Sequence, residues 1–304
     1  MNDTILGGIK ISNQICLRME DSAKYICDLF QSDQPFLIGR NGTIELEVVS
    51  KYLFKVPLTE LNKNKLELNA GIFPSTPESI ESFCIDYIEA LQNVDVMAEG
   101  WYEPLKKVEK EILDNLNPNR VKVLLRNLEP YYVKPSLRWT QYLNGKRVAI
   151  INSFAETCEQ QTYMSKAIWP NNTETLLPQD TTWIPIQTYY SPTLAGKNIN
   201  TQWPEYVINY KDAVNDVVER VLESKAHIAI IGCGGMGMII GSKLKDAGLK
   251  CIVMGGATQI LFGIRGKRWE NHNIISTFFN DAWVVPNPKN IPSNYSLVEN
   301  GCYW

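Results

Sequence analysis

Three short apolar runs, each ending in glycine or small polar residues, constrain the fold of this chain more than any other feature. They are 36–38 before the turn 39–42, 146–151 before Asn152-Ser153, and 227–231 before the turn 232–235. Each run is followed by a segment whose apolar residues recur at helical spacing, so strands and helices alternate along the chain. Such alternation favours a mostly parallel sheet with helices on both faces. We therefore expect an α/β, Rossmann-like fold.

The same pattern predicts further elements and a single α/β domain over residues 1–304. We expect an N-terminal half of about 1–143, a C-terminal βαβ half of about 144–285, and a tail, 286–304. Helices are predicted at 43–53, 77–91, 102–116, 154–167, 203–224 and 235–247, and further strands at 94–97, 183–187 and 251–254. Because ligands in parallel α/β folds bind beyond the carboxyl ends of the strands, the three glycine or polar turns should line one crevice.

Composition narrows the class of protein. The 304 residues include 30 Lys plus Arg and 33 Asp plus Glu, a near balance that argues against a nucleic-acid partner. Seven cysteines without a C-x-x-C pair are typical of free thiols in a reducing compartment. The chain starts without a secretory signal pattern, and no run approaches the roughly 20 apolar residues of a membrane span. We expect a cytoplasmic protein, and a homo-oligomer is left open.

The segment IIGCGGMGM, residues 230–238, contains G-x-G-x-x-G directly after an apolar strand. Glycines let backbone N–H groups approach an anion at the positive end of the following helix, which favours a phosphate. The alternative is a tight turn that only needs close packing. A dinucleotide site would also need a carboxylate at the end of the next strand, 251–254. The first carboxylate after that strand is Glu270, so NAD is not expected. Candidate phosphate-binding residues are Gly232, Gly234, Gly235, Met236, Gly255 and Gly256.

The turn GRNGTIE, residues 39–45, is a second candidate. Arg40 is suited to paired hydrogen bonds with a phosphate, and Glu45 to a divalent ion that bridges a diphosphate. In the alternative interpretation, Thr43 is a helix N-cap and Glu45 is a first-turn acid favoured by the helix dipole. The candidate binding residues here are Gly39, Arg40, Asn41, Gly42 and Thr43, with Glu45 as a catalytic or metal-binding residue.

Two further segments carry candidate ligand contacts. Ser153 begins a predicted helix, and Glu156 three residues later forms a capping-box pattern, although the same N–H groups are suited to a ligand. A basic and aromatic cluster offers contacts to a diphosphate or an acceptor, or else forms a solvated turn with one buried Trp. Its candidate residues are Arg265, Lys267, Arg268 and Trp269.

The sequence gives little indication of which residues would act as nucleophile or catalytic base. The only histidines, His227 and His272, argue against a Ser-His-Asp or Cys-His hydrolase. Cys233 in the glycine loop is either an activated thiol at a helix N-terminus or a small residue that fits the turn. Four acids lie near predicted strand ends or in the C-terminal loop, and of these Glu99 is our candidate base. The four are Asp95, Glu99, Glu270 and Asp281.

Taken together, these motifs resemble the GT-D type glycosyltransferases, nucleotide-sugar enzymes with a Rossmann-like fold. Residues 40–45, Arg-Asn-Gly-Thr-Ile-Glu, match the family's Arg-x-Gly-Asp-Gly-Glu segment, and 143–148 match its Leu-x-Gly-Lys-(Lys/Arg)-Val strand. The glycine loop, Lys243, Gly248 and the strand end 254–256 match its last βαβ unit. The resemblance extends from about Phe36 to Trp269.

The resemblance implies a sugar transfer from a nucleotide-sugar donor to a glycan or other hydroxyl acceptor. In the family an Asp-x-Glu pair holds Mn²⁺ or Mg²⁺, but this chain has Thr43 in place of the Asp and retains only Glu45. The acceptor is expected on segments 128–139 and 170–192, which are rich in Tyr, Trp and Asn. The alternatives are an NAD(P)-dependent oxidoreductase and a non-catalytic nucleotide- or sugar-binding protein.

Overall fold

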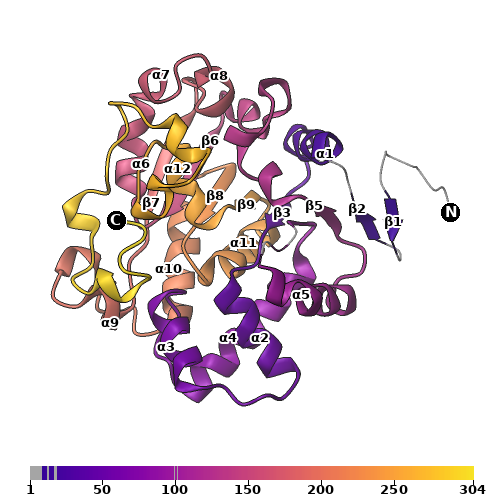
Figure 1. Cartoon of the computed structure of the whole chain (residues 1–304), viewed down its shortest axis with the longest axis vertical. Coiled ribbons are helices and arrows are strands. Elements are labelled where there is room, and N and C mark those ends of the chain that lie inside the picture. The colour runs from indigo at the N-terminus through magenta and orange to yellow at the C-terminus, as the bar shows by residue number, and fades with distance from the viewer. Residues whose placement is uncertain (1–8, 12–13, 17–18, 99, 101) are drawn as a thin grey trace.

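The computed structural model describes residues 9–11, 14–16, 19–98, 100 and 102–304, and one sheet runs through it. The strands are β1 (Ile9–Ile11), β2 (Gln14–Cys16), β3 (Phe36–Gly39), β4 (Val96–Ala98), β5 (Val121–Val123), β6 (Arg147–Asn152), β7 (Thr182–Gln187), β8 (Ile228–Gly232) and β9 (Lys250–Val253). Seven of them form the all-parallel main part of the sheet, in the order β5-β4-β3-β9-β8-β6-β7, and β2 pairs parallel with β5 (Figure 1). A β1–β2 hairpin extends the sheet beyond β5. The predicted α/β, Rossmann-like fold is confirmed.

Thirteen α-helices and several 3₁₀ helices connect the strands of the described part. The α-helices are α1 (Met19–Gln31), α2 (Thr43–Leu53), α3 (Glu60–Leu68), α4 (Pro77–Asn93), α5 (Glu103–Leu116), α6 (Ala155–Thr162), α7 (Ser165–Ile168), α8 (Thr173–Leu176), α9 (Pro192–Ala195), α10 (Tyr210–Glu223), α11 (Met236–Asp246), α12 (Thr258–Leu261) and α13 (Lys267–Glu270). The 3₁₀ helices are Leu125–Asn127, Pro130–Tyr132, Pro135–Leu137, Trp139–Leu143, Ile199–Thr201, Gly255–Ala257, Ile275–Phe278, Pro288–Asn290 and Tyr295–Leu297.

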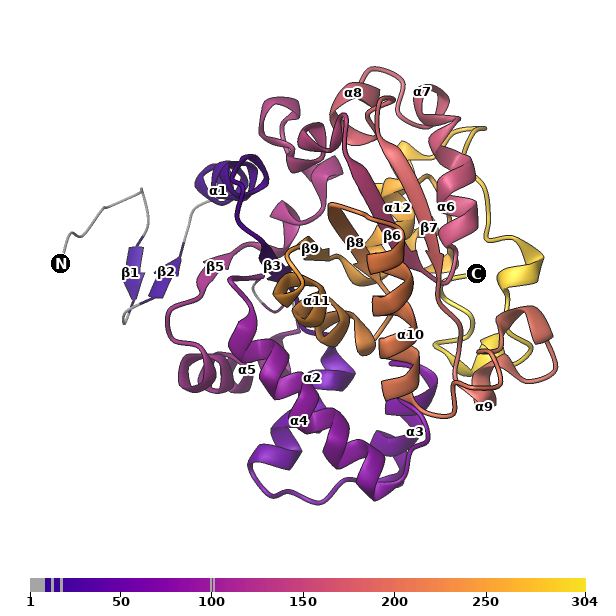
Figure 2. The same ribbon diagram turned by 180° about the vertical axis from the view of Figure 1, so that it is seen from behind.

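The sheet separates two hydrophobic cores because successive strand residues point to opposite faces. Leu37 and Ile231 pack with helices α2–α5, α10 and α11 on one face, which Figure 2 shows in front. Ile38 and Ile230 pack with α1, α6–α8, α12 and the 3₁₀ helices of 125–143 on the other. Both faces of the sheet are thus covered, as the continuous apolar runs predicted.

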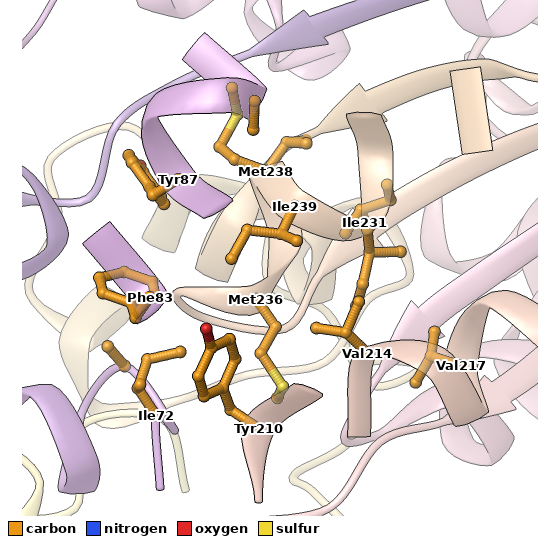
Figure 3. Packing of buried hydrophobic residues seen from close by; sticks show 14 of the residues in the cluster. Ile72, Phe83, Tyr87, Tyr210, Val214, Val217, Ile231, Met236, Met238 and Ile239 are labelled. Atoms are coloured by element: carbon orange, nitrogen blue, oxygen red, sulfur yellow. The ribbon is translucent and has the colours of Figure 1, made fainter. Parts of the chain in front are cut away.

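Helix α11, which follows the glycine loop, is fixed by aromatic and methionine side chains. Met236 and Ile239 of α11 lie beside Phe83 of α4 and Tyr210 of α10 in the same buried cluster (Figure 3). The Phe83 and Tyr210 rings meet edge to face with centroids 6.0 Å apart. Since all four side chains are buried, the start of α11 is held tightly against its neighbours.

Several predicted elements differ from the observed ones. The helix expected at 203–224 begins only at Tyr210, because the Asn209 side chain accepts the N–H groups of Lys211 and Asp212 and caps it there. Tyr206, which lies inside the predicted helix range, precedes α10 and is 68% exposed. The helix expected at 154–167 is divided into α6 and α7. Helices α1 and α3, strand β5 and the β1–β2 hairpin were not predicted, because each is short or lacks a glycine turn.

All seven parallel strands end at the same edge of the sheet. Asp95 precedes β4 and therefore lies at the opposite edge, where its carboxylate accepts the N–H of Leu37 at 2.8 Å and pairs with Lys245. In the described part of the chain, none of the helices has the length and apolar character that a bilayer crossing requires.

Truncating a central strand residue should test this core. We expect Ile230→Ala to lower the free energy of unfolding by about 2–5 kcal/mol, because Ile230 is fully buried in β8 between two parallel strands. The matched control Ile208→Ala, at a residue 73% exposed, should change it by less than about 0.5 kcal/mol. Urea titrations followed by tryptophan fluorescence measure both. Equal losses in the two variants would contradict this packing.

Candidate functional site

A cleft of about 910 Å³ opens at the carboxyl edge of the sheet. The turns that follow all seven parallel strands contribute to it, which is where α/β folds bind ligands, and its volume suits a small-molecule site. By strand, the described lining residues are Arg40 and 42–45 after β3, Gly100 after β4, 124–126 and Glu129 after β5, 152–154 at β6, 188–191 after β7, 232–234 at β8, and 255–257 after β9.

Arg40 lines this cleft. Within the described part of the chain its guanidinium makes neither a hydrogen bond nor an ion pair. A Cβ on Gly255, which has a φ of +60°, would lie 4.0 Å from Nη1 of Arg40, so the guanidinium lies over the turn after β9. Burial raises the pKa of Glu45 and of Glu129, and the charge of Arg40 opposes part of that rise. The geometry therefore leaves a cation open to an anionic ligand between two strand ends.

Asn41 holds the turn that carries Arg40. Its side chain is 6% exposed and accepts a hydrogen bond from Tyr87 Oη at 2.9 Å, while its Nδ2 donates to Glu109 Oε1 at 2.8 Å. A Cβ on Gly39 would lie 2.7 Å from Cε of Met238, so a larger residue there would require that side chain to move. Neither Gly39 nor Asn41 lines the cleft. Their role in the structure is to position Arg40.

Glu45 is folded back against the same turn. It lies in the first turn of α2, whose N-cap is Gly42 and not Thr43 as one interpretation predicted. A Cβ on Gly42 would lie 2.6 Å from Cδ of Glu45, so the carboxyl group rests on that glycine. Burial raises the pKa of Glu45, and a hydrogen bond from its own backbone N–H and the charge of Arg40 oppose this.

The divalent metal that the resemblance implies does not fit these residues. A hard cation such as Mg²⁺ is usually held by carboxylates together with other oxygen ligands. In the part of the chain that the structure describes, no three His, Cys, Asp or Glu side chains converge on one point. Thr43 lines the cleft where the family has its Asp, which leaves Glu45 as the one carboxylate of the segment 40–45.

The glycine loop before α11 is shaped largely by packing. Gly234 has a φ of +62°, and a Cβ there would lie 2.7 Å from the carbonyl oxygen of Ala70. The N–H of Gly235 donates to that same oxygen at 2.8 Å, so one N–H at the start of α11 is already satisfied. Gly232, Gly234 and Met236 line the cleft, whereas Gly235 does not. Close packing accounts for these glycines without a ligand.

Cys233 in the same loop is not an activated thiol. Burial raises the pKa of its thiol to about 12, because a thiolate there would lose its hydration. At neutral pH the side chain is a neutral thiol, which agrees with the simpler interpretation of a small residue that fits the turn.

The turn after β6 differs from its predicted form. Helix α6 begins at Ala155 with Phe154 as N-cap, and no side chain caps it, so the capping box of Ser153 and Glu156 is wrong. The Asn152 side chain instead accepts the N–H of Phe154 at 2.8 Å and donates to the Gly232 carbonyl at 2.8 Å. This ties the β6 and β8 turns together and leaves Ser153 on the cleft wall.

The basic and aromatic cluster contributes only in part. Arg268 and Trp269 line the cleft, together with His272. Arg268 donates to Tyr303 Oη at 2.9 Å and pairs with Glu299. Arg265 and Lys267 do not line the cleft. Their cationic groups lie instead over aromatic rings, Arg265 above Phe279 and Lys267 above Tyr295.

Three of the four predicted acids, Asp95, Glu270 and Asp281, are described by the structure, and none of these three lines the cleft. Glu99 lies outside the described residues. Asp95 is at the other edge of the sheet, and neither Glu270 nor Asp281, both exposed, lines the cleft.

Sequence reasoning did not single out two groups of lining residues. Arg126 follows β5, a three-residue strand without a glycine turn to mark it, and Glu129 was included only as part of the segment 128–139. The C-terminal residues Tyr303 and Trp304 form an aromatic wall with Trp269. The ring centroids of Tyr303 and Trp304 are 6.0 Å apart, and those of Trp269 and Tyr303 are 6.1 Å apart. Only the number of aromatic residues in the tail hinted at this wall.

The segments expected to bind the acceptor lie only partly on the cleft. From 128–139 only Glu129 lines it, and from 170–192 only 188–191. Tyr131 and Trp139 are core residues, exposed by 6% and 1%. Aromatic content alone could not distinguish buried rings from lining ones.

Comparison with known proteins adds no assignment. Searches with protein-family models, against curated proteins and against solved structures all returned no match to this chain.

The buried Glu45 should make stability depend on pH. Since its pKa is raised in the folded protein, its contribution to stability is fully present below the ordinary value of 4.5 and is lost as the pH rises through the folded-state pKa. We expect Glu45→Gln to flatten this part of the pH profile and to raise the melting temperature at neutral pH. Melting temperatures measured between about pH 4 and 8 give this dependence for the wild type and the variant. The exposed control Glu156→Gln should leave the profile unchanged, and an unaltered slope in Glu45→Gln would contradict the burial of this carboxyl group.

Proposed function

We propose that this protein is a glycosyltransferase of the GT-D type, which moves a sugar from a nucleotide-sugar donor to a hydroxyl acceptor. The observation that carries the proposal is the guanidinium of Arg40, which has no partner among the described residues. It lies in a cleft of about 910 Å³, on a turn held by the buried hydrogen bonds of Asn41. Arginine presents a planar set of donors that matches phosphate oxygens. A guanidinium that is free for a ligand, on a turn held by buried hydrogen bonds, is suited to a diphosphate.

The donor diphosphate is proposed to lie between Arg40 and the turns after β8 and β9. Gly255 and Gly256 leave room beside Arg40, and the positive end of α11 adds a favourable field. Arg268 extends the positive charge along the wall. Since the residues do not fit a divalent metal, these protein cations are the groups that would neutralise the leaving diphosphate.

The acceptor side is proposed to be the aromatic wall. Tyr190, Trp269, Tyr303 and Trp304 all line the cleft, and Tyr190 and Trp304 have ring centroids 5.8 Å apart. Tyr and Trp combine an apolar ring with a polar group, which suits the mixed faces of a sugar. A glycan acceptor is therefore favoured over a fully apolar one.

Two other functions have specific observations for or against them. An oxidoreductase would need a carboxylate at the end of β9 for the nucleotide ribose, but Met254, Gly255 and Gly256 follow Val253 there. A non-catalytic binding protein is favoured by Thr43 in place of the metal-binding Asp. Turnover of a sugar nucleotide distinguishes this second alternative from the transferase.

Nucleotide binding tests the proposal directly. We expect UDP or GDP to bind the full chain, measured by calorimetry and thermal shift alongside CMP and NAD, with and without manganese. Arg40→Ala should weaken that binding about 10- to 100-fold, because charge-assisted hydrogen bonds contribute roughly 1.5–3 kcal/mol. The matched control Arg147→Ala, at the amino end of β6 on the opposite sheet edge, should bind as the wild type does.

Three outcomes decide the matter. Stabilisation by NAD alone would contradict the transferase and favour the oxidoreductase. Binding of a nucleoside diphosphate without hydrolysis or transfer of any sugar nucleotide would favour the binding protein. Equal affinity in Arg40→Ala and the wild type would remove the observation on which the proposal depends.

A further inference from the structure

Three carboxylates line the cleft in the described part of the chain, and they differ in what they are free to do. Glu45 is folded against Gly42 and its own backbone N–H. Glu299 is exposed and paired with Arg268 on the C-terminal segment. Glu129 is 7% exposed and follows β5. Only Glu129 combines burial with an oxygen that the protein does not use.

Glu129 is rigidly held. Arg126 Nη1 donates to its Oε2 at 2.9 Å, and the Arg126 guanidinium is itself fixed over the ring of Tyr132, 4.0 Å from the centroid. The backbone carbonyl of Glu129 accepts the N–H of Tyr132 at 3.0 Å. No hydrogen bond to Oε1 is formed within the described residues. One oxygen is therefore anchored, and the other remains open to a ligand.

The surroundings of Glu129 suit a proton acceptor. The charged and titratable groups that act on it are Arg126, Arg40, His272, Tyr131 and Tyr132. Burial raises the pKa of Glu129, and Arg126, Arg40 and His272 oppose that rise. The Nδ1 of His272 accepts the N–H groups of Ile274 and Ile275 at 3.2 Å, which orients this ring where it lines the cleft.

We propose that Glu129 is the general base of the transfer, an inference that rests on the proposed function. Its free Oε1 accepts the proton of the acceptor hydroxyl while that hydroxyl oxygen forms a bond to the anomeric carbon of the donor. In the same step the bond from that carbon to the diphosphate oxygen breaks. The electron pair leaves on the diphosphate, whose new negative charge faces Arg40, and the proton passes from Glu129 to water after product release.

Hydrolysis of sugar nucleotides tests this role, with water as the acceptor that the base activates. The full chain is assayed with UDP-glucose, UDP-N-acetylglucosamine and GDP-mannose, and the fastest donor is taken forward. We expect Glu129→Gln to lower kcat about 10²- to 10⁴-fold, while the affinity for UDP or GDP stays within about threefold of the wild type. The same change at exposed Glu270, which does not line the cleft, should leave both quantities unaltered.

Two further measurements separate a base from a structural residue. The wild-type rate should fall at acidic pH as Glu129 becomes protonated, and Glu129→Gln should lose that acidic limb. Glu129→Asp retains a carboxylate and should be at least about tenfold faster than Glu129→Gln. Melting curves and UDP or GDP binding verify that each variant is folded.

The outcomes distinguish this inference from the proposed function. If Glu129→Gln hydrolyses the donor at the wild-type rate, retains the acidic limb, or equals Glu129→Asp, then Glu129 is not the base although the transferase stands. If the wild type neither binds a nucleoside diphosphate nor hydrolyses any of the three donors, the transferase itself is wrong, and the role of Glu129 is wrong with it.

Discussion

The hydrogen bonds of one buried amide determine how the candidate site is arranged. Asn41 accepts from Tyr87 of α4 and donates to Glu109 of α5, and so ties the turn after β3 to two helices behind it. Each of these groups would cost about 1–3 kcal/mol if it were buried without a partner. Because Asn41 satisfies both, these bonds stabilise the turn, and its neighbour Arg40 lies on the cleft side.

The arginines beside this turn explain why this part of the cleft tolerates two buried carboxyl groups. Glu45 and Glu129 are both exposed by less than a tenth, and desolvation alone would favour their neutral forms. Arg40 acts on both carboxyl groups and Arg126 on Glu129, so positive charge offsets part of that cost. A ligand with negative charge near Arg40 would weaken this compensation and make Glu129 a stronger proton acceptor.

Much of the fold could be predicted from local pattern. Helix α2 has the predicted bounds, and strands β6 and β8 lie within one residue of theirs, because their apolar runs are bounded by glycine or small polar residues. Strand β5 was not predicted, because three residues are too few to show a hydrophobic periodicity. The long helix expected from 203 was predicted too early, since Asn209 caps it at a point where the apolar stripe gives no sign.

The candidate site divides in a similar way. The turns containing Arg40, Ser153 and Gly232 could be predicted as cleft residues because parallel strands must end at one edge. Whether a given residue in such a turn faces the ligand or the core depends on neighbours far away in the sequence. Asn41 faces inward because Tyr87 and Glu109 are there to bond it.

The sequence by itself determined the alternation of strands and helices, and with it the edge of the sheet where a ligand would bind. This follows from local physics, since hydrophobic periodicity and turn residues act over a few positions. Only the tertiary structure decided that Glu129 and the Tyr303-Trp304 wall belong to the cleft, and that Asp95 does not. The reason is that long-range packing, which no local pattern encodes, brings β5 and the C-terminal segment to the same edge as β3, β8 and β9.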